Sequence, residues 1–372
     1  MSSSNCLCRE RRKKALKKES SNNEADEVFR KVEQNKELWE LFTKTEEYDA
    51  ALLDKYGRFP YYLSRQRNVF EPEVSEFLLK NGLNPEYPEE KKFAVCLTHD
   101  IDFVCTGMLN TAARTVKALK RGQFAEASML PFSRINKSWN PLWNFRRIME
   151  LEEKYGAKST FYFLTLDPGN EDFTFSIEEL EGELYRISDE GWEVGLHGGH
   201  EAYNNLAEIK KKKRKLEKVL GKEVMGYRNH YLRFKTPDTW KLLADAGFSY
   251  DSTFGYHDCA GFRNGMCHPF KPYNLKTGEE INILELPLTI MDTTLFHSQM
   301  RLDFEKAWDL TERLILTVER CRGVLTILWH NTYMQGEYLE FYKKILQLCS
   351  EKEAWMTSGV QICNWWKKEY HS

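Results

Sequence analysis

The chain has 372 residues, of which 41% are hydrophobic and 30% charged, and its formal net charge is -2 at pH 7. This length and composition allow one large domain or two modest ones around a sizeable buried core. The near-zero net charge argues against a protein that binds nucleic acid by bulk positive charge, and no apolar run approaches the roughly 20 residues that a membrane-spanning helix needs.

The N-terminal part of the chain is polar and then helical in pattern. The stretch MSSSNCLCRERRKKALKKES lacks the apolar core of a secretory signal, and we predict a disordered basic tail over residues 1–27. Residues 28–90 are predicted to form a helical extension, because ADEVFRKVEQNKELWELF carries apolar residues at helical spacing. The nine cysteines include no CxxC pair, which favours reduced thiols in a cytoplasmic protein.

From Phe93 onward, strand-like apolar runs alternate with helix-like amphipathic ones. Strands are expected at 93–100, 158–164, 192–199, 224–230, 248–256, 282–292 and 324–332, and helices at 142–156, 176–191, 205–221, 236–247 and 304–323. This alternation indicates a parallel sheet covered by helices. We therefore predict an α/β fold, a distorted (β/α) barrel of six to eight units over residues 91–372, with an open doubly wound sheet as the alternative.

A basic amphipathic helix is expected after the first strand. The sequence MLNTAARTVKALKRGQF, residues 108–124, has this pattern. We expect it to pack over the barrel, and the alternative is a weak contact with an anionic membrane surface.

Polar residues follow five of the apolar strands. They occur in the motifs THDID, GLHGGHE, GYRNHY, YDST and LWHN. In a barrel of parallel strands, the carboxyl ends of the strands meet at one rim, where functional residues gather. Carboxylates and imidazoles at one rim favour a divalent metal ion with oxygen and nitrogen ligands.

Two aspartates and one histidine are the first candidates for this metal site. Asp100 and Asp102 follow the same strand, and a cation between them would offset their repulsion, so one can bind the metal while the other acts as a general base. His197 directly follows an apolar strand and is the clearest imidazole ligand. His200 and Glu201 lie three and four residues further on, and either can meet His197 if a helical turn starts there.

Other polar residues at the strand ends have candidate roles around the metal. Arg228 could pair with the free aspartate and keep it ionised. Asp251 could orient Arg228 or a histidine, while His230 and Tyr231 are predicted to contact the substrate. His330 ends a strongly apolar strand and is a candidate general acid.

Taken in order, LTHDID, GLHGGHEAY, GYRNHYLRF, DSTFGY and LTILWH resemble the five motifs of the polysaccharide deacetylase family, also called carbohydrate esterase family four. The resemblance covers roughly residues 91–335. It implies a distorted (β/α) barrel and a divalent metal ion, often zinc. It also implies hydrolysis of an N-acetyl group from an amino sugar, in which metal-bound water attacks the amide.

The resemblance also implies residue roles. It makes Asp100 the base, Asp102 and His197 metal ligands, and Arg228 the residue that steadies the base. His330 would be the acid, and Leu328 would line a pocket for the acetyl group.

The chain departs from the family pattern at two positions. Ile101 separates aspartates that are usually adjacent, as in a D-x-D subset of the family that lacks a secretion signal. Glu201 stands where the second motif usually has its second histidine, and His200 is one residue short. The spacing favours Glu201 as the third ligand, with His200 as the alternative.

The implied partner is an N-acetylated saccharide, and for this subset an intracellular one, such as a nucleotide- or lipid-linked sugar; no nucleic acid is expected. Two alternative functions stay open. The same metal centre could cleave a cyclic amide or imide, or the barrel could have lost catalysis and bind glycans or protein partners. The sequence carries no signal for an oligomeric state.

Overall fold

A curled parallel sheet forms the centre of the protein in the computed structural model, which describes residues 28–104 and 140–370. The strand order is β8-β5-β4-β3-β2-β1-β10-β9, and β11 pairs with β1. The strands are β1 (Ala94–Ile101), β2 (Thr160–Leu164), β3 (Glu193–Gly198), β4 (Gly226–Asn229), β5 (Tyr250–Asp251), β8 (Leu284–Glu285), β9 (Leu288–Met291), β10 (Val324–Leu328) and β11 (Trp355–Thr357). A separate antiparallel hairpin consists of β6 (Tyr273–Asn274) and β7 (Glu279–Glu280).

The sheet curls until its two ends come together. β8 and β9 stand at opposite ends of the strand order, yet only Leu286 and Pro287 separate them along the chain. The ladders along this order are all parallel. The molecule is therefore a distorted (β/α) barrel, as the alternating sequence pattern predicted.

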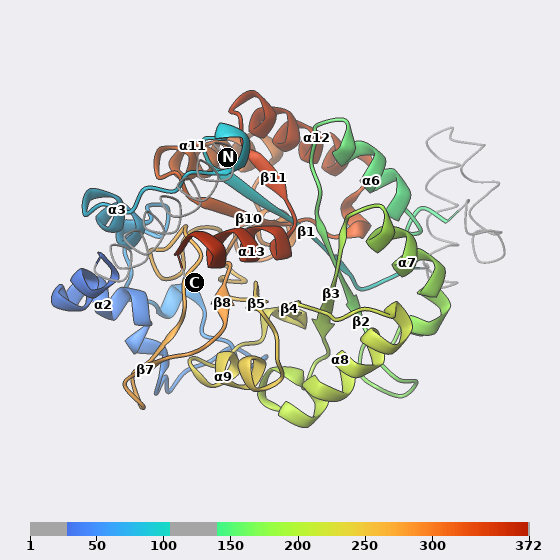
Figure 1. The fold of residues 1–372 in the computed structure, drawn as a ribbon, viewed down its shortest axis with the longest axis horizontal. Helices are drawn as coiled ribbons and strands as arrows, with labels where there is room; N and C mark the ends of the chain where they lie inside the picture. The colour runs from blue at the N-terminus through green and yellow to red at the C-terminus, as the bar shows by residue number, and fades with distance from the viewer. Residues whose placement is uncertain (1–27, 105–139, 371–372) are drawn as a thin grey trace, which may run out of the picture.

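Helices surround the barrel, as Figure 1 shows for α6, α7, α8, α11 and α12. The helices of the barrel are α6 (Phe145–Glu153), α7 (Glu181–Asp189), α8 (Leu206–Leu220), α9 (Asp238–Asp245), α10 (Asp292–Phe296), α11 (Phe304–Arg320), α12 (Gly336–Glu351) and α13 (Gly359–Tyr370). The N-terminal extension contains a helical segment at 28–34, α2 (Lys36–Thr43) and α3 (Glu73–Lys80). Local signals fix their ends: the Asn205 side chain caps the start of α8, and Gly221, with φ +72°, ends it.

The structure differs from the expected elements in three places. The segment 282–292 is two strands rather than one, because Pro287 has no N–H to donate to a ladder. The strand expected at 248–256 is only two residues long, as β5. The elements α12, β11 and α13 were not expected, and the basic tail 1–27 and the helix expected at 108–124 lie outside the described residues.

Inside the barrel, large aromatic side chains lie against glycine residues. Tyr162 and Tyr250 are fully buried, and their hydroxyl groups are 3.0 Å apart. A Cβ on Gly195 would lie 2.5 Å from the ring of Tyr162, and a Cβ on Gly226 would lie 2.2 Å from the hydroxyl of Tyr250. The glycines thus make room for the aromatic rings that fill the barrel interior.

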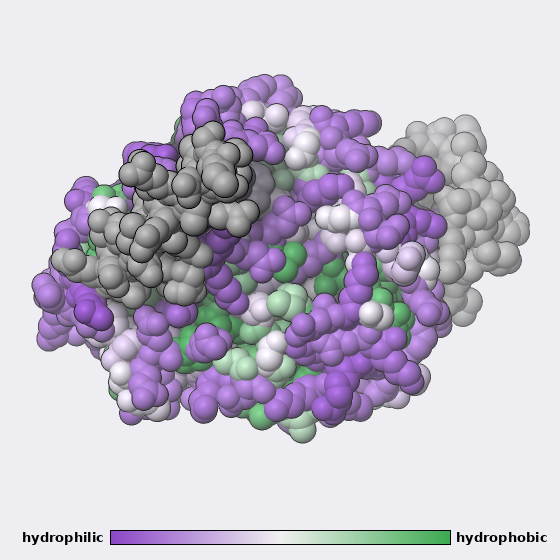
Figure 2. All heavy atoms as spheres, in the orientation of Figure 1, coloured by the Kyte–Doolittle hydropathy of each residue, from purple (hydrophilic) through white to green (hydrophobic). Residues whose placement is uncertain are grey.

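The last helix closes the end of the barrel where the strands begin. The backbone N–H of Gly359 donates to Thr160 Oγ1 at 2.9 Å, and that of Val360 donates to Glu193 Oε2 at 2.8 Å. In Figure 1, α13 crosses in front of the strands, and Figure 2 shows this face as largely hydrophilic. The opposite rim, where the strands end, is where the polar motifs lie. Among the described residues, no helix has the length and apolar character to cross a membrane.

A buried ion pair joins the N-terminal extension to the barrel. Arg263 Nε and Nη2 donate to the two carboxylate oxygens of Glu47 at 3.0 and 2.8 Å. Thr236 Oγ1 also donates to Glu47 Oε2 at 2.7 Å. Val32 and Phe42 of the extension belong to the same hydrophobic cluster as the strands of the barrel. The extension and the barrel therefore share one core.

Removal of Glu47 tests this connection. We expect Glu47→Ala to lower the free energy of unfolding by about 3–5 kcal/mol, because it leaves a buried guanidinium without its partner. Urea denaturation measures the loss. Glu353→Ala is the matched control, since Glu353 pairs with Lys92 on the surface, and it should leave the midpoint unchanged. Equal stability of the two variants would contradict the assigned role.

Candidate metal centre

The ends of four strands bring ionisable side chains to one rim of the barrel. Asp102 follows β1, His197 lies on β3, His230 follows β4, and His330 follows β10. The parallel ladder between β3 and β4 places His197 opposite Arg228. The rim therefore collects carboxylates and imidazoles that are distant in sequence.

Asp102, His197 and His230 form the tightest group. Asp102 Oδ1 lies 3.2 Å from His197 Nε2 and 3.5 Å from His230 Nδ1. The two imidazole nitrogens are 3.1 Å apart. One oxygen and two nitrogens thus face a common point, which makes these residues a candidate metal-binding group.

The hydrogen bonds of the two imidazoles determine which nitrogens face this point. His197 Nδ1 lies 3.0 Å from the backbone carbonyl of Arg228, which only accepts, so Nδ1 carries the proton and Nε2 has the lone pair. His230 Nε2 lies 3.4 Å from the carboxylate oxygen Asp172 Oδ2, and a proton on Nε2, facing this acceptor, would leave the lone pair on Nδ1. Two lone pairs at 3.1 Å repel each other unless a proton or a cation lies between them.

The state of Asp102 agrees with a cation at this point. Its Oδ1 is buried and has no hydrogen-bond donor among the described residues. A carboxylate with two neutral imidazoles matches the ligand set that Zn²⁺ and similar divalent ions prefer, with coordination positions left open. The residues present therefore fit such an ion.

Asp100 lies beside this group and pairs with a buried arginine. Arg228 Nη1 lies 3.3 Å from Asp100 Oδ1 and donates to Thr98 Oγ1 at 2.6 Å. Its Nη2 and Nε donate to the side chain and the backbone carbonyl of Ser252, both at 3.1 Å. Burial alone would lower the pKa of Arg228, but the negative charge of Asp100 raises it. The guanidinium is therefore fixed by Thr98 and Ser252 with one nitrogen toward the carboxylate of Asp100.

His330 is held by a carboxylate that the sequence analysis did not single out. Its Nδ1 lies 2.7 Å from Asp292 Oδ1, and its backbone N–H donates to Asp292 Oδ2 at 2.6 Å. Its Nε2 points toward Asp102 Oδ2, 3.7 Å away. Burial alone would lower the pKa of His330, but the negative charges of Asp292, Asp102 and Asp100 raise it to about 10. Asp292 ends the apolar run LPLTIMD, the same signal that identified the other strand ends.

Among the described residues, Asp251 makes no hydrogen bond to Arg228 or to a histidine of the rim. Its Oδ1 accepts from the backbone N–H and the hydroxyl of Thr253, at 3.1 and 2.6 Å. It lies beside the buried Glu285 on β8. Ser252, its neighbour, makes the contacts with Arg228 that Asp251 was expected to make.

Glu201 and His200 lie apart from the three-ligand group. Glu201 is 70% exposed, and its Oε1 lies 3.5 Å from Arg233 Nη1 and 3.7 Å from His200 Nε2. His200 Nε2 is 3.8 Å from Glu171 Oε2. His230 occupies the place beside Asp102 and His197 that the spacing argument gave to Glu201.

The two remaining predicted substrate residues lie in different settings. Leu328 is fully buried in a small apolar cluster with Leu232, Leu288 and Met291, separate from the main core. Tyr231 donates its hydroxyl hydrogen to Asp172 Oδ1 at 3.2 Å. The ring of Tyr231 stacks on Tyr56 of the N-terminal extension, with centroids 4.7 Å apart.

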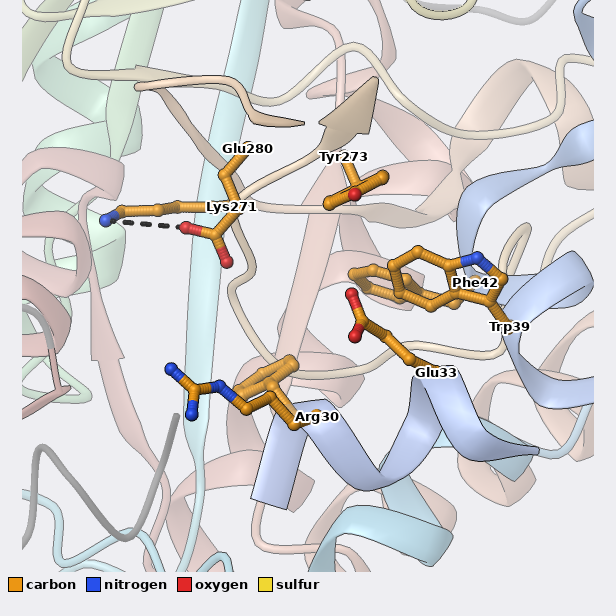
Figure 3. A pocket seen from close by; sticks show the side chains of 8 residues that line it. Arg30, Glu33, Trp39, Phe42, Lys271, Tyr273 and Glu280 are labelled. Carbon is orange, nitrogen blue, oxygen red and sulfur yellow. Dashed lines mark ion pairs between the residues drawn. The ribbon is translucent and has the colours of Figure 1, made fainter. Parts of the chain in front are cut away.

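A different cavity, of about 320 Å³, lies between the N-terminal helices and the β6–β7 hairpin (Figure 3). Trp39, Phe42 and Tyr273 form its aromatic walls, and Lys271 and Glu280 form an ion pair at 3.9 Å beside it. No histidine or cysteine is among the described residues that line it. Its chemistry differs from that of the rim, and it shares no residue with the metal-binding group.

A comparison with solved structures finds similar proteins. A candidate polysaccharide deacetylase from Mycobacterium smegmatis matches with a TM-score of 0.51 and 19% identity, covering 75% of this chain and 92% of that one. A CE4 family pseudoenzyme from Bacillus anthracis matches with a TM-score of 0.39 and 14% identity, covering 74% and 66%. A polysaccharide deacetylase from Bacillus cereus matches with a TM-score of 0.34 and 15% identity, covering 72% and 91%.

No protein-family model matches the chain, and no curated protein matches it in sequence. The structural comparison nevertheless shows that the chain has the fold of the polysaccharide deacetylases. The resemblance inferred from the five motifs is confirmed at the level of the fold.

The buried pair Asp251 and Glu285 predicts a dependence of stability on pH. Burial raises the pKa of Asp251 from 3.8 to about 6. Because the folded pKa exceeds the unfolded one, this contribution to stability is complete below pH 3.8 and is lost as the pH rises through 6. We expect Asp251→Asn to flatten the fall of the free energy of unfolding over this range. Denaturant titrations at successive pH values measure it.

The matched control for this titration is Asp189→Asn, which changes an exposed carboxyl at the end of α7. It should keep the wild-type dependence on pH. An unchanged dependence in Asp251→Asn as well would show that Asp251 titrates at its ordinary pKa in the folded protein.

Proposed function

We propose that this protein is a metal-dependent hydrolase that removes the N-acetyl group of an amino sugar within a saccharide. The observation that carries the proposal is the convergence of Asp102, His197 and His230 beside an ion-paired Asp100 and a carboxylate-held His330. A metal site, a base and an acid are the three parts that metal-dependent hydrolysis of an amide uses. The shared fold with polysaccharide deacetylases supports the choice of substrate class.

The proposed ligands are Asp102 through Oδ1, His197 through Nε2 and His230 through Nδ1. A divalent ion held there, with zinc as the first candidate, supplies a Lewis acid that polarises the amide carbonyl and lowers the pKa of water. This set replaces Glu201 and His200, the third ligands that the sequence spacing suggested.

Asp100 is the proposed general base. Arg228 lies 3.3 Å from its Oδ1, and its other oxygen, Oδ2, lies 3.6 Å from His197 Nε2. That oxygen is therefore next to the proposed ion and can accept a proton from the attacking water. Arg228 is fixed by Thr98 and Ser252 and acts by orienting Asp100.

His330 is the proposed general acid. Its Nδ1 is committed to Asp292, so Nε2 is the nitrogen that can deliver a proton to the departing amine. The carboxylates around it raise its pKa to about 10, which keeps Nε2 protonated at neutral pH. A cation bound by Asp102 would offset one of these negative charges and bring this pKa down toward the range in which an acid transfers protons efficiently.

The apolar cluster around Leu328 is the proposed binding site for the acetyl methyl group. It consists of Leu232, Leu288, Met291 and Leu328, and β10 places Leu328 two residues before His330. A methyl group held there would orient the amide carbonyl toward the ligands. Tyr231, at the other side of His230, is the proposed contact for the sugar.

Metal analysis distinguishes the two possible ligand sets. We expect about one equivalent of divalent metal per chain, and loss of that metal in Asp102→Ala, His197→Ala and His230→Ala, because each removes one of three converging donors. Glu201→Gln should retain it. Elemental analysis after purification in metal-replete buffer measures the content. Metal lost from Glu201→Gln and kept by His230→Ala would restore the set expected from the sequence.

Substitution of the base tests the chemistry. We expect Asp100→Asn to release acetate from N-acetylglucosamine oligosaccharides about 10²–10⁴-fold more slowly than the wild type, because a proton acceptor is lost. The variant should still bind metal and unfold at nearly the same temperature. Glu201→Gln, at the same rim, should keep the wild-type rate. Unchanged acetate release in Asp100→Asn would exclude Asp100 as the base.

A further inference from the structure

His230 is positioned differently from the other two proposed ligands. His197 lies within β3, whereas His230 begins a short turn after β4, in which Tyr231 and Leu232 have φ angles of +58° and +51°. Two successive non-glycine residues in this left-handed region are energetically unfavourable and persist only where their surroundings hold them. The direction of the His230 imidazole therefore depends on contacts from outside its own strand.

The N-terminal extension holds the backbone of this turn. The guanidinium of Arg58 donates to the carbonyl oxygen of Tyr231, and Tyr56 stacks on the ring of Tyr231 at an interplanar angle of 13°. Arg233 Nε in turn donates to the carbonyl of Tyr56 at 2.8 Å. These contacts fix the turn, but none of them reaches the imidazole of His230.

Asp172 contacts the imidazole itself. Its Oδ2 lies 3.4 Å from His230 Nε2, and its Oδ1 accepts from the hydroxyl of Tyr231 at 3.2 Å. Asp172 also has a left-handed backbone, with φ +65°. Thr174, two residues on, donates to the backbone carbonyl of Asp102. The segment that carries Asp172 is thus hydrogen-bonded to the backbone of Asp102, one proposed ligand, and contacts His230, another.

We propose that Asp172 is the positioning residue of His230, and that it accepts the Nε2 proton so that the Nδ1 lone pair faces Asp102 and His197. This inference rests on the metal site proposed above. Asp172 does for His230 what the carbonyl of Arg228 does for His197: it selects the tautomer and fixes the plane of the ring. Carboxylates that accept from a ligating histidine usually strengthen metal binding by 10–100-fold.

The test is the affinity of the metal-free protein for Co²⁺, measured by competition with a chromophoric chelator. We expect one site in the wild type and 10–100-fold weaker binding in Asp172→Asn, because an amide can present N–H to Nε2 and favour the wrong tautomer. The visible absorption of bound Co²⁺ should also change. Asp172→Ser serves as a second variant if the first does not fold.

Two controls separate orientation of the imidazole from general effects. Glu171→Gln removes a neighbouring carboxylate that is 68% exposed and should bind Co²⁺ like the wild type. Tyr231→Phe removes the other hydrogen bond of Asp172 and leaves its contact with His230, so its affinity should change by less than about threefold. In the metal-free wild type, ¹⁵N NMR should show His230 protonated at Nε2.

The outcomes distinguish this inference from the proposed function. A wild type that binds Co²⁺ and an Asp172→Asn variant that binds it equally well would overturn the role of Asp172 and leave the metal site standing. A wild type that binds no Co²⁺ would overturn both. A weaker site in Asp172→Asn, with Glu171→Gln unchanged, supports the role assigned here.

Discussion

Two imidazole lone pairs and a carboxylate oxygen face one another across about 3 Å at the rim of the barrel, and the rest of the site is arranged around this contact. Without a cation or a proton between the two nitrogens it is unfavourable: His197 and His230 would present lone pairs to each other, and Asp102 Oδ1 is buried without a donor among the described residues. A divalent ion at this point, as proposed above, would make ligands of all three. The fold maintains the arrangement, because each imidazole is in contact with a residue outside the group of three: His197 with the carbonyl of Arg228, and His230 with Asp172.

The sheet supplies the most rigid of these partners. The ladder between β3 and β4 places the carbonyl of Arg228 against His197 Nδ1, while the side chain of Arg228 runs through the barrel to Asp100. One residue thus orients a ligand through its backbone and a base through its guanidinium. Burying this charge is costly unless its donors are satisfied, and Thr98, Asp100 and Ser252 satisfy them.

The sequence predicted the barrel because its signal is periodic and local. Helix-spaced and strand-like runs alternate, glycines mark helix ends, and polar residues follow the strands. The same signal placed Asp100, Asp102, His197, Arg228 and His330 at one rim, where the structure has them. Their chemical roles remain predictions. The strands β8 and β9 were harder to foresee because they are short and Pro287 separates them. The helix α12 was not predicted, although its buried residues recur at helical spacing.

Spacing along the sequence did not predict which side chain lies beside Asp102 and His197. Counting from His197 to Glu201 assumed that a helical turn starts at the end of the strand, but the chain continues outward, and Glu201 reaches Arg233 instead. His230 lies beside Asp102 and His197 because the turn that follows it contains two residues with left-handed backbone. Tyrosine and leucine rarely adopt that conformation, so the sequence at Tyr231 and Leu232 does not predict it. Similarly, Asp292 rather than Asp251 contacts a histidine of the rim, because β9 pairs with β10 and ends beside His330.

The two proposed imidazole ligands therefore differ in how they are secured. His197 depends on a backbone carbonyl, which no side-chain substitution can remove, whereas His230 depends on the carboxylate of Asp172 and on a turn held by Tyr56 and Arg58. These last two residues belong to the N-terminal extension, so the barrel alone does not contain every group that shapes its rim. Because Glu47 and Arg263 tie that extension to the barrel core, the folding of the extension and the geometry of the third ligand are physically coupled.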